Sequence, residues 1–250
     1  MNDTLRYYDS NAQAFIEATF SVPMSPLYEH FLPRIPKGGH ILDAGCGSGR
    51  DALYFHQQGY RVTAFDGSRA MAELASKKTG LPITHRTFTD VSEIKLYDGI
   101  WACASLLHLQ APEIADALSR LWNALKPGGL LYLSFKHGTG EHVKDGRHFL
   151  YANEELAGRW IDDLQEVREC TIWRTEDQRP DRSETWLNIL VARDFEPYQR
   201  LTTGGNAQHF LPKICQAIKI SDQIDFAVAF VKKTGLSLLM PDLIDALSRR

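Results

Sequence analysis

Residues 40–50 read HILDAGCGSGR, and this stretch decides the fold of the chain. An apolar, strand-like run, His40–Ala44, passes directly into a turn with Gly45, Gly47 and Gly49 at alternate positions. Glycine there lets the backbone turn tightly and approach a ligand without Cβ atoms in the way. The helical pattern of Gly49–Gln58 follows at once. This order of elements is typical of a parallel α/β sheet with a ligand site at the turn.

Apolar runs and helical patterns alternate on both sides of this stretch. The apolar runs are continuous, which indicates a parallel sheet that is covered on both faces. Two later segments, rich in β-branched and aromatic residues, predict an antiparallel hairpin. We therefore expect a doubly wound α/β fold, with a seven-stranded, mostly parallel sheet that ends in an antiparallel strand. Its strands are expected at residues 40–44, 61–65, 82–86, 99–104, 130–135, 166–174 and 184–192, and its helices at 11–19, 49–58, 68–78, 112–125 and 153–162.

The bulk composition is that of an ordinary globular protein. Of 250 residues, 44% are apolar and 24% charged, and the net charge of −3 gives no general support for nucleic-acid binding. No apolar run is long enough to cross a membrane, and the N-terminus has no signal-peptide core, so we expect a cytoplasmic protein with no membrane partner. The four cysteines form no C-x-x-C pair, so we expect no bound metal.

The chain divides into two parts near residue 195. Residues 1–195 are expected to form one domain, because they hold every element of the predicted sheet. The segment 195–205 reads as a linker, and residues 206–250 carry a helix-strand-helix pattern. A single strand cannot build an independent sheet, so the second part, residues 196–250, is either docked on the first or the start of a truncated domain.

The acidic residue before the glycine turn narrows the choice of ligand. In a dinucleotide-binding turn of the form G-x-G-x-x-G, the third glycine would fall at Arg50. Asp43 places a fixed negative charge beside the turn, and this charge would repel a bound diphosphate. A ligand with an ammonium group instead gains a charge-assisted hydrogen bond from Asp43, and a ligand carboxylate can use backbone N–H groups of the turn.

Two further carboxylates follow the second and third strands. Asp66 closes the second strand at the spacing of an acid that accepts from ribose hydroxyls, although it could instead cap the helix that starts near Ser68. Asp90 could accept from an adenine amino group with Phe88 against the base, or it could be a surface turn acid. The predicted cofactor-binding residues are Asp43, Gly45, Cys46, Gly47, Gly49, Asp66, Gly67, Phe88, Asp90 and Ala104, together with Tyr8, which could fold over the cofactor or simply pack its helix.

Four motifs in order resemble the class I S-adenosylmethionine-dependent methyltransferases. They are ILDAGCGSGR, VTAFDGS, YDGIWACASLLHL and LKPGGLLYLSF, and the resemblance spans roughly residues 38–194. It implies S-adenosylmethionine as cofactor, a seven-stranded sheet, and a cofactor lined by Asp43, Gly45, Gly47 and Asp66. The loop at residues 136–150 is long for this family, and the third strand is unusually polar.

A different resemblance concerns the C-terminal part. The stretch FLPKICQAIKISDQIDFAVAFVKKTGLSLLMPDLIDAL resembles the opening of phospholipase-D-like nuclease domains of the kind fused to helicases. The His-x-Lys signature of that family is absent from the chain, so no nuclease activity follows. The resemblance implies a possible nucleic-acid partner for the C-terminal segment.

The methyl acceptor is expected beyond the fourth and fifth strands. His108, just past the fourth strand, could act as a general base or orient the substrate, or it could be a packed histidine between two leucines. Lys136, His137 and Arg147 follow the fifth strand and could bind an anionic or polar small molecule, or belong to a solvated loop.

The favoured function is methylation of an oxygen, nitrogen or sulfur atom of a small molecule. A nucleic-acid methyltransferase linked to a nuclease or helicase polypeptide is the main alternative, followed by a cofactor-binding module without catalysis. A nicotinamide oxidoreductase is disfavoured by Asp43 and Arg50.

Overall fold

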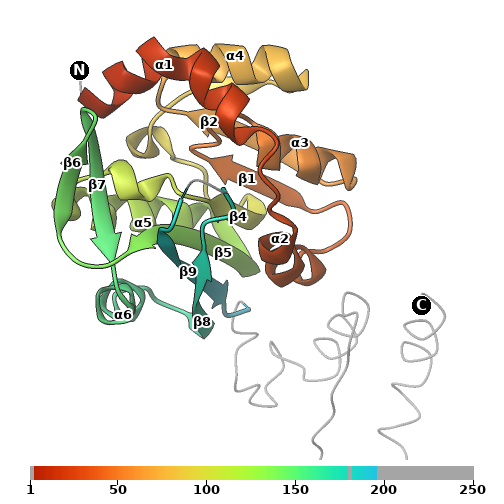
Figure 1. Cartoon of the computed structure of the whole chain (residues 1–250). Coiled ribbons are helices and arrows are strands. Elements are labelled where there is room, and N and C mark those ends of the chain that lie inside the picture. Colours follow the sequence, from red (N-terminus) through yellow and green to blue (C-terminus); the bar gives the residue numbers. More distant parts are fainter. Residues whose placement is uncertain (1–2, 180–181, 196–250) are drawn as a thin grey trace, which may run out of the picture. The chain divides into compact units, whose positions relative to one another are not determined.

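The buried run His40–Ala44 forms β1 in the middle of a nine-stranded sheet (Figure 1). The computed structural model describes residues 3–179 and 182–195. Five strands run parallel in the order β3 (Ile83–His85), β2 (Arg61–Asp66), β1, β4 (Tyr97–Ala102) and β5 (Leu125–His137). β9 (Thr185–Arg193) pairs antiparallel with β5, and β8 (Val167–Glu176) pairs antiparallel with β9. The predicted doubly wound α/β fold with an antiparallel strand near its end is confirmed.

Helices lie on both faces of this sheet, and local capping sets several of their ends. The side chain of Ser68 accepts a backbone N–H at the start of α4 (Arg69–Thr79), and that of Asn153 does the same at the start of α6 (Glu154–Asp162). Gly80, in the left-handed conformation, ends α4. The helices are α1 (Asp3–Thr19), α2 (Ser25–Phe31), α3 (Arg50–Gln57), α4 (Arg69–Thr79), α5 (Ile114–Ala124) and α6 (Glu154–Asp162). Short 3-10 turns are η1 (Leu32–Arg34), η2 (Phe88–Asp90), η3 (Leu106–His108) and η4 (Ala111–Glu113). The sequence did not predict α2.

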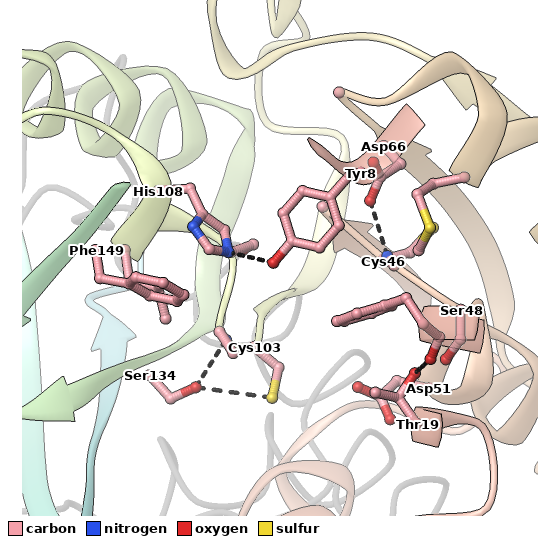
Figure 2. Close-up of a pocket in the computed structure, with 18 of the residues that line it drawn as sticks. Tyr8, Thr19, Cys46, Ser48, Asp51, Asp66, Cys103, His108, Ser134 and Phe149 are labelled. Carbon is pink, nitrogen blue, oxygen red and sulfur yellow. Dashed lines mark hydrogen bonds between the residues drawn. The ribbon is translucent and has the colours of Figure 1, made fainter. Parts of the chain in front are cut away.

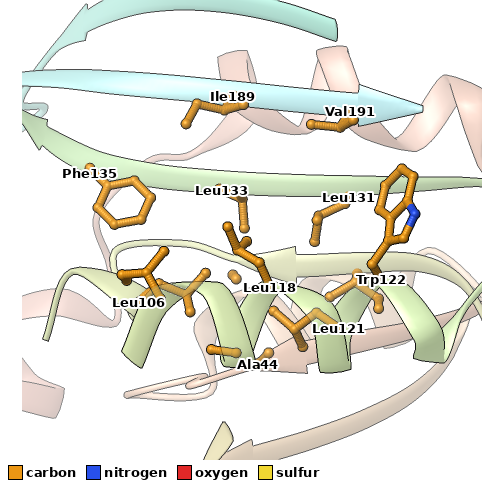
Figure 3. Packing of buried hydrophobic residues seen from close by; sticks show 14 of the residues in the cluster. Ala44, Leu106, Leu118, Leu121, Trp122, Leu131, Leu133, Phe135, Ile189 and Val191 are labelled. Carbon is orange, nitrogen blue, oxygen red and sulfur yellow. The ribbon is translucent and has the colours of Figure 1, made fainter. Parts of the chain in front are cut away.

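Alternate residues of the central strands are buried on opposite faces, which explains why these strands read as continuous apolar runs. On one face, Leu131 and Leu133 of β5 lie against Leu118 and Leu121 of α5, with β9 beside them (Figure 3). Burying one such leucine side chain stabilises the fold by about 2 kcal/mol.

The opposite face is aromatic. Trp101 of β4 and Tyr132 of β5 stack with ring centroids 3.9 Å apart. Phe31 of α2 and Phe55 of α3 pack edge-on against Trp101, with ring centroids 5.1 and 5.5 Å away. Together these two layers fix the sheet between helices and so fix the loops that leave its carboxyl edge.

The polar segment 136–150 is a hairpin and not the irregular loop that the sequence predicted. β6 (Glu141–Lys144) pairs antiparallel with β7 (Arg147–Ala152), and β7 pairs with the end of β5. Asp145 and Gly146 connect them with φ angles of 54° and 76°, the left-handed pair that a two-residue hairpin turn requires. This hairpin accounts for the two strands beyond the seven that were expected.

The order of the strands reverses between β1 and β4. The chain moves from β1 outward through β2 to β3, and then returns to the other side of β1 for β4 and β5. Loops diverge at such a reversal and leave a crevice at the carboxyl ends of the strands. Within the described residues, no helix has both the length and the hydropathy to cross a bilayer. The segment 196–250, with its predicted domain boundary, linker and phospholipase-D-like pattern, lies outside the described residues.

Candidate functional site

A cavity of about 900 Å³ opens where the strand order reverses. Its walls come from the glycine turn after β1, the segments after β4 and β5, helix α1 with the linker to α2, and the turn between β8 and β9. Segments that are far apart in the sequence therefore meet at one edge of the sheet, where α/β folds place their ligands.

The glycine turn is tightly packed, most of all at Gly45. Gly45 and Gly47 have φ angles of 76° and 54°. A Cβ atom on Gly45 would lie 2.5 Å from the Cβ of Ser105, so only glycine fits there. The N–H groups of Gly45 and Cys46 both donate to the carbonyl of Phe65, at 3.0 and 2.9 Å. These N–H groups are engaged within the protein, contrary to the expectation that they face a ligand carboxylate.

Asp66 holds the glycine turn against the start of α4. Its carboxylate accepts the N–H of Gly47 at 2.9 Å and the N–H of Ser68 at 2.8 Å. Burial raises the pKa of Asp66, and these two hydrogen bonds act in the opposite direction. Ser68 caps α4 with its own side chain, so Asp66 is not the helix cap. Asp66 lines the cavity, and each of its carboxylate oxygens can accept a further hydrogen bond. It can therefore also accept hydrogen bonds from the two hydroxyl groups of a diol.

Asp43 is a buried carboxylate without a complete set of partners. It is 2% exposed, lines the cavity, and its Oδ2 has no hydrogen-bond partner. Burial and the neighbouring Asp51 raise the pKa of Asp43 well above its ordinary value. A buried carboxylate in this state gains most from a cationic ligand, because such a ligand supplies both the missing charge and the missing donor.

By contrast, Asp51 in the first turn of α3 has its hydrogen-bond partners within the protein. It accepts hydrogen bonds from Tyr28, from Trp101 Nε1 at 2.9 Å and from Arg50 Nε at 2.7 Å. Burial alone would raise the pKa of Asp51, but the Arg50 ion pair and these hydrogen bonds bring it below its ordinary value. Arg50 also donates to the carbonyl of Thr19 and so ties the end of α1 to the site.

Of the two residues predicted to contact the adenine, Phe88 and Asp90, the structure places only Phe88 on the cavity wall. Phe88 lies on the cavity wall, with its ring 5.6 Å from that of Phe65. Asp90 does not line the cavity. Its Oδ2 instead accepts hydrogen bonds from the N–H of Thr87 at 2.8 Å and from the hydroxyl of Thr87 at 2.9 Å, and thereby caps η2. Gly67 and Ala104 line the cavity, as do Gly45, Cys46 and Gly47.

Two other predicted residues also lie outside the cavity wall. Gly49 packs at the start of α3, where an added Cβ would meet Thr79 at 2.9 Å and Ile83 at 3.1 Å. His137 faces Glu154 on α6, with 3.6 Å between its Nε2 and the Oε2 of Glu154. The role of Gly49 is therefore to close the turn, and His137 has no position from which to touch a ligand in the cavity.

Tyr8 and His108 form the polar centre of the cavity. The Tyr8 hydroxyl lies 2.8 Å from His108 Nε2 (Figure 2). His108 Nδ1 lies 2.8 Å from the carbonyl oxygen of His148. A carbonyl only accepts, so Nδ1 carries the proton and Nε2 accepts from Tyr8. Burial lowers the pKa of His108 to about 4 and raises that of Tyr8 to about 12, so both are neutral at pH 7.

Lys136 and Arg147 stand beside this pair. The guanidinium of Arg147 lies 4.4 Å from the centre of the Tyr7 ring and 5.2 Å from that of Phe149, and Lys136 Nζ lies 4.7 Å from the Phe149 ring. Lys136 also forms an ion pair with Glu184, just before β9. The sequence thus identified two cations that the fold brings to one cavity.

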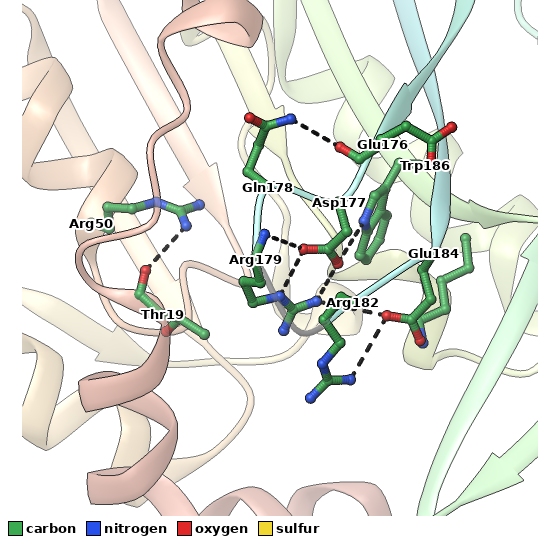
Figure 4. A network of polar contacts seen from close by, with 10 residues as sticks. Thr19, Arg50, Glu176, Asp177, Gln178, Arg179, Arg182, Glu184 and Trp186 are labelled. Atoms are coloured by element: carbon green, nitrogen blue, oxygen red, sulfur yellow. Dashed lines mark hydrogen bonds and ion pairs between the residues drawn. The ribbon is translucent and has the colours of Figure 1, made fainter.

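Long-range packing supplies wall residues that the sequence did not reveal. Ser134 on β5 accepts the N–H of Ala104 at 2.8 Å and lies 3.7 Å from the sulfur of Cys103. The turn from Glu176 to Glu184 contributes an ion-paired group that includes Asp177 and Arg179 (Figure 4). No local pattern marks these residues, because their place depends on β9 lying beside β5.

Comparison with known proteins identifies the central part of the chain. Residues 41–129 match the family model of the methyltransferase domain. Malonyl-[acyl-carrier protein] O-methyltransferase of Salmonella typhimurium is 33% identical over 95 residues, which cover 36% of this chain and 36% of that protein. The putative methyltransferase YqeM of Bacillus subtilis is 27% identical over 132 residues, which cover 50% of this chain and 53% of that protein. The chain thus spans about half, or less, of these curated relatives.

Solved structures share the fold. The 1,6-didemethyltoxoflavin-N1-methyltransferase of Burkholderia thailandensis, solved with 1,6-didemethyltoxoflavin and S-adenosylhomocysteine, superposes with a TM-score of 0.61 and 21% identity. The match covers 77% of this chain and 86% of that one. Residues 41–129 thus match a methyltransferase-domain model, and the solved structures show that the chain shares the fold of such proteins. The assignment of individual site residues stays a prediction.

Proposed function

We propose, on the match of residues 41–129 to a methyltransferase-domain model, that the chain transfers a methyl group from S-adenosylmethionine to an oxygen, nitrogen or sulfur atom of a small molecule. The observation that carries this proposal is a pair of carboxylates, the buried Asp43 and the half-buried Asp66, on either side of a tight glycine turn in one cavity. This charge pattern suits a ligand with an ammonium group and a sugar diol and would repel a diphosphate.

The cofactor residues follow from the partners that each side chain lacks. Asp43 Oδ2, buried and without a donor, would accept from the ammonium group. Asp66, held by Gly47 and Ser68, would accept from the ribose hydroxyls. Since the N–H groups of Gly45, Cys46 and Gly47 are engaged, the cofactor carboxylate is better matched to Arg50, which lines the same cavity. Phe88 is placed to pack against the adenine.

When bound, S-adenosylmethionine supplies a methyl group on a cationic sulfur, which needs an aligned nucleophile more than a strong base. Tyr8 is well suited to provide that alignment. Its proton is directed at His108 Nε2, so the remaining lone pairs of its oxygen can accept a hydrogen bond from the acceptor. His108 acts through Tyr8 in this arrangement, as a positioning residue, instead of touching the acceptor as a base.

A transfer assay tests the proposal. The protein is incubated with S-adenosylmethionine carrying a labelled methyl group, once with a small-molecule cell extract and once with total RNA. The proposal predicts label in the small-molecule fraction, and loss of that label in the Asp43→Asn variant. Label in the RNA alone would favour the nucleic-acid alternative, and cofactor binding with no transfer to either fraction would favour a non-catalytic module.

A further inference from the structure

The two ends of the cavity differ in charge. At the glycine turn the described charged residues of the wall are Asp43, Asp51, Asp66 and Arg50. At the far end, among the described residues, five cations line the wall, Lys136, Lys144, Arg147, Arg179 and Arg182. Glu176 and Asp177 line the wall beside these cations, Glu113 and Asp116 line it after β4, and Glu184 pairs with Lys136. Arg179 pairs with Asp177 and Arg182 with Glu184, whereas the ion-pair partner of Arg147 is the exposed Asp145.

Arg147 has a buried side-chain donor that lacks a hydrogen-bond partner. Its side chain is 14% exposed, and its acidic neighbour Asp145 is 61% exposed at a distance of 3.3 Å. Its Nε is buried without a hydrogen-bond partner. The guanidinium also packs against the rings of Tyr7 and Phe149. A preorganised, partly desolvated guanidinium of this kind is suited to bind a carboxylate or phosphate.

Arg147 is also close to the predicted reaction centre. Its Cζ lies 6.0 Å from the centre of the Tyr8 ring, and the neighbouring carbonyl of His148 holds His108 at 2.8 Å. Lys136 approaches the same Phe149 ring that Arg147 contacts. An anion bound by these two cations would consequently bring the rest of its molecule next to the Tyr8 hydroxyl.

We propose that the methyl acceptor is a small organic anion whose carboxylate or phosphate is bound by Arg147, with Lys136 beside it. This inference rests on the proposed methyl transfer and adds the chemical class of the acceptor. The apolar faces of Phe149 and Leu107 on the same wall would bury the uncharged part of that molecule.

Binding of matched probes to the protein saturated with S-adenosylhomocysteine tests the inference. The probes are benzoate, phenyl phosphate and the neutral benzamide, each titrated by calorimetry. We expect at least one anion to bind ten times or more tightly than benzamide, and the better anion distinguishes a carboxylate from a phosphate acceptor. Arg147→Gln should remove the preference. Arg174→Gln removes an exposed cation of β8 that pairs with Glu154 outside the cavity, and it should preserve the preference.

The outcomes separate the two proposals. If the wild-type protein does not bind S-adenosylhomocysteine, the proposed function fails and this inference fails with it. If S-adenosylhomocysteine binds but neither anion is preferred over benzamide, or Arg147→Gln retains the preference, only the inference is overturned. Should Arg147→Gln lose S-adenosylhomocysteine binding through misfolding, Lys136→Gln gives the same comparison, with a weakened anion preference expected and an unchanged preference counting against the inference.

Discussion

Replacing Asp43 by asparagine should improve or preserve folding while damaging cofactor binding. The side chain is buried, and Asp51 adds to the cost of keeping it ionised. Asparagine has nearly the same shape and removes the charge. A residue that served only to stabilise the fold would give the opposite result, because its loss would lower the free energy of unfolding.

The size of each effect follows from the surroundings of Asp43. The raised pKa means that the folded state binds more protons than the unfolded state between the ordinary pKa of about 4 and the raised value. The stability of the wild-type protein therefore falls as the pH rises through this window, by about 1.4 kcal/mol for each unit of pKa shift. Asp43→Asn lacks this loss, so its stability relative to wild type should be highest at pH 8 and should decline towards pH 4. A lost charge-assisted hydrogen bond costs about 1.5–3 kcal/mol, which corresponds to a roughly 10- to 150-fold weaker affinity for the cofactor.

Two measurements on the same samples check this. Urea unfolding at several pH values gives the stability of both proteins, and calorimetry with S-adenosylhomocysteine gives the affinity. An Asp43→Asn protein that binds S-adenosylhomocysteine as tightly as wild type would refute the assignment of Asp43 to the ammonium group. A variant several kcal/mol less stable than wild type at pH 8 would refute the account of its burial.

Three further predictions concern neighbouring groups. Asp51→Asn should cost about 3–5 kcal/mol in urea unfolding, because it leaves Arg50 without its buried partner; a loss below 1 kcal/mol would show that the pair does not stabilise the fold. Burial lowers the pKa of His108 from 6.5 to about 4, so the unfolded chain binds more protons than the folded protein between these pH values. The stability of the wild-type protein, relative to His108→Gln, should therefore fall by about 3 kcal/mol as the pH is lowered from 7 to 4. A stability difference that does not change with pH would mean that His108 is not buried. Asp90→Asn should lower the melting temperature through a loss of about 1 kcal/mol in the cap around Thr87 and change the affinity for S-adenosylhomocysteine less than threefold, whereas a tenfold loss would restore a direct contact with adenine.

The parallel strands could be predicted because burial on both faces leaves a plain mark in the sequence. β1 has five buried residues in succession, and the glycine turn after it tolerates no side chain at Gly45. The β6–β7 hairpin was missed because every residue of β6 is exposed, so no apolar pattern marks it. Asp145-Gly146 was the available signal, since this dipeptide favours the left-handed pair of a two-residue turn. Helix α2 is seven residues long, too short for a helical period to stand out.

The site divides in the same way between local and distant contributions. Asp43 and Asp66 lie at the carboxyl ends of strands that the sequence defines, so both could be placed at the cavity. The pairing of Tyr8 with His108 joins residues 100 positions apart. It depends on α1 lying against β7, where Thr4 accepts the N–H of His148 at 2.8 Å. Sequence reasoning that works through local periods has no access to such a contact.

The central claim is that the cavity at the glycine turn accepts a sulfonium nucleoside and not a dinucleotide. Calorimetric titration of the wild-type protein with S-adenosylmethionine and, separately, with NAD tests this most directly. The arrangement of Asp43 and Asp66 predicts saturable binding of S-adenosylmethionine at one site per chain and no measurable heat with NAD. Binding of NAD without binding of S-adenosylmethionine would contradict it.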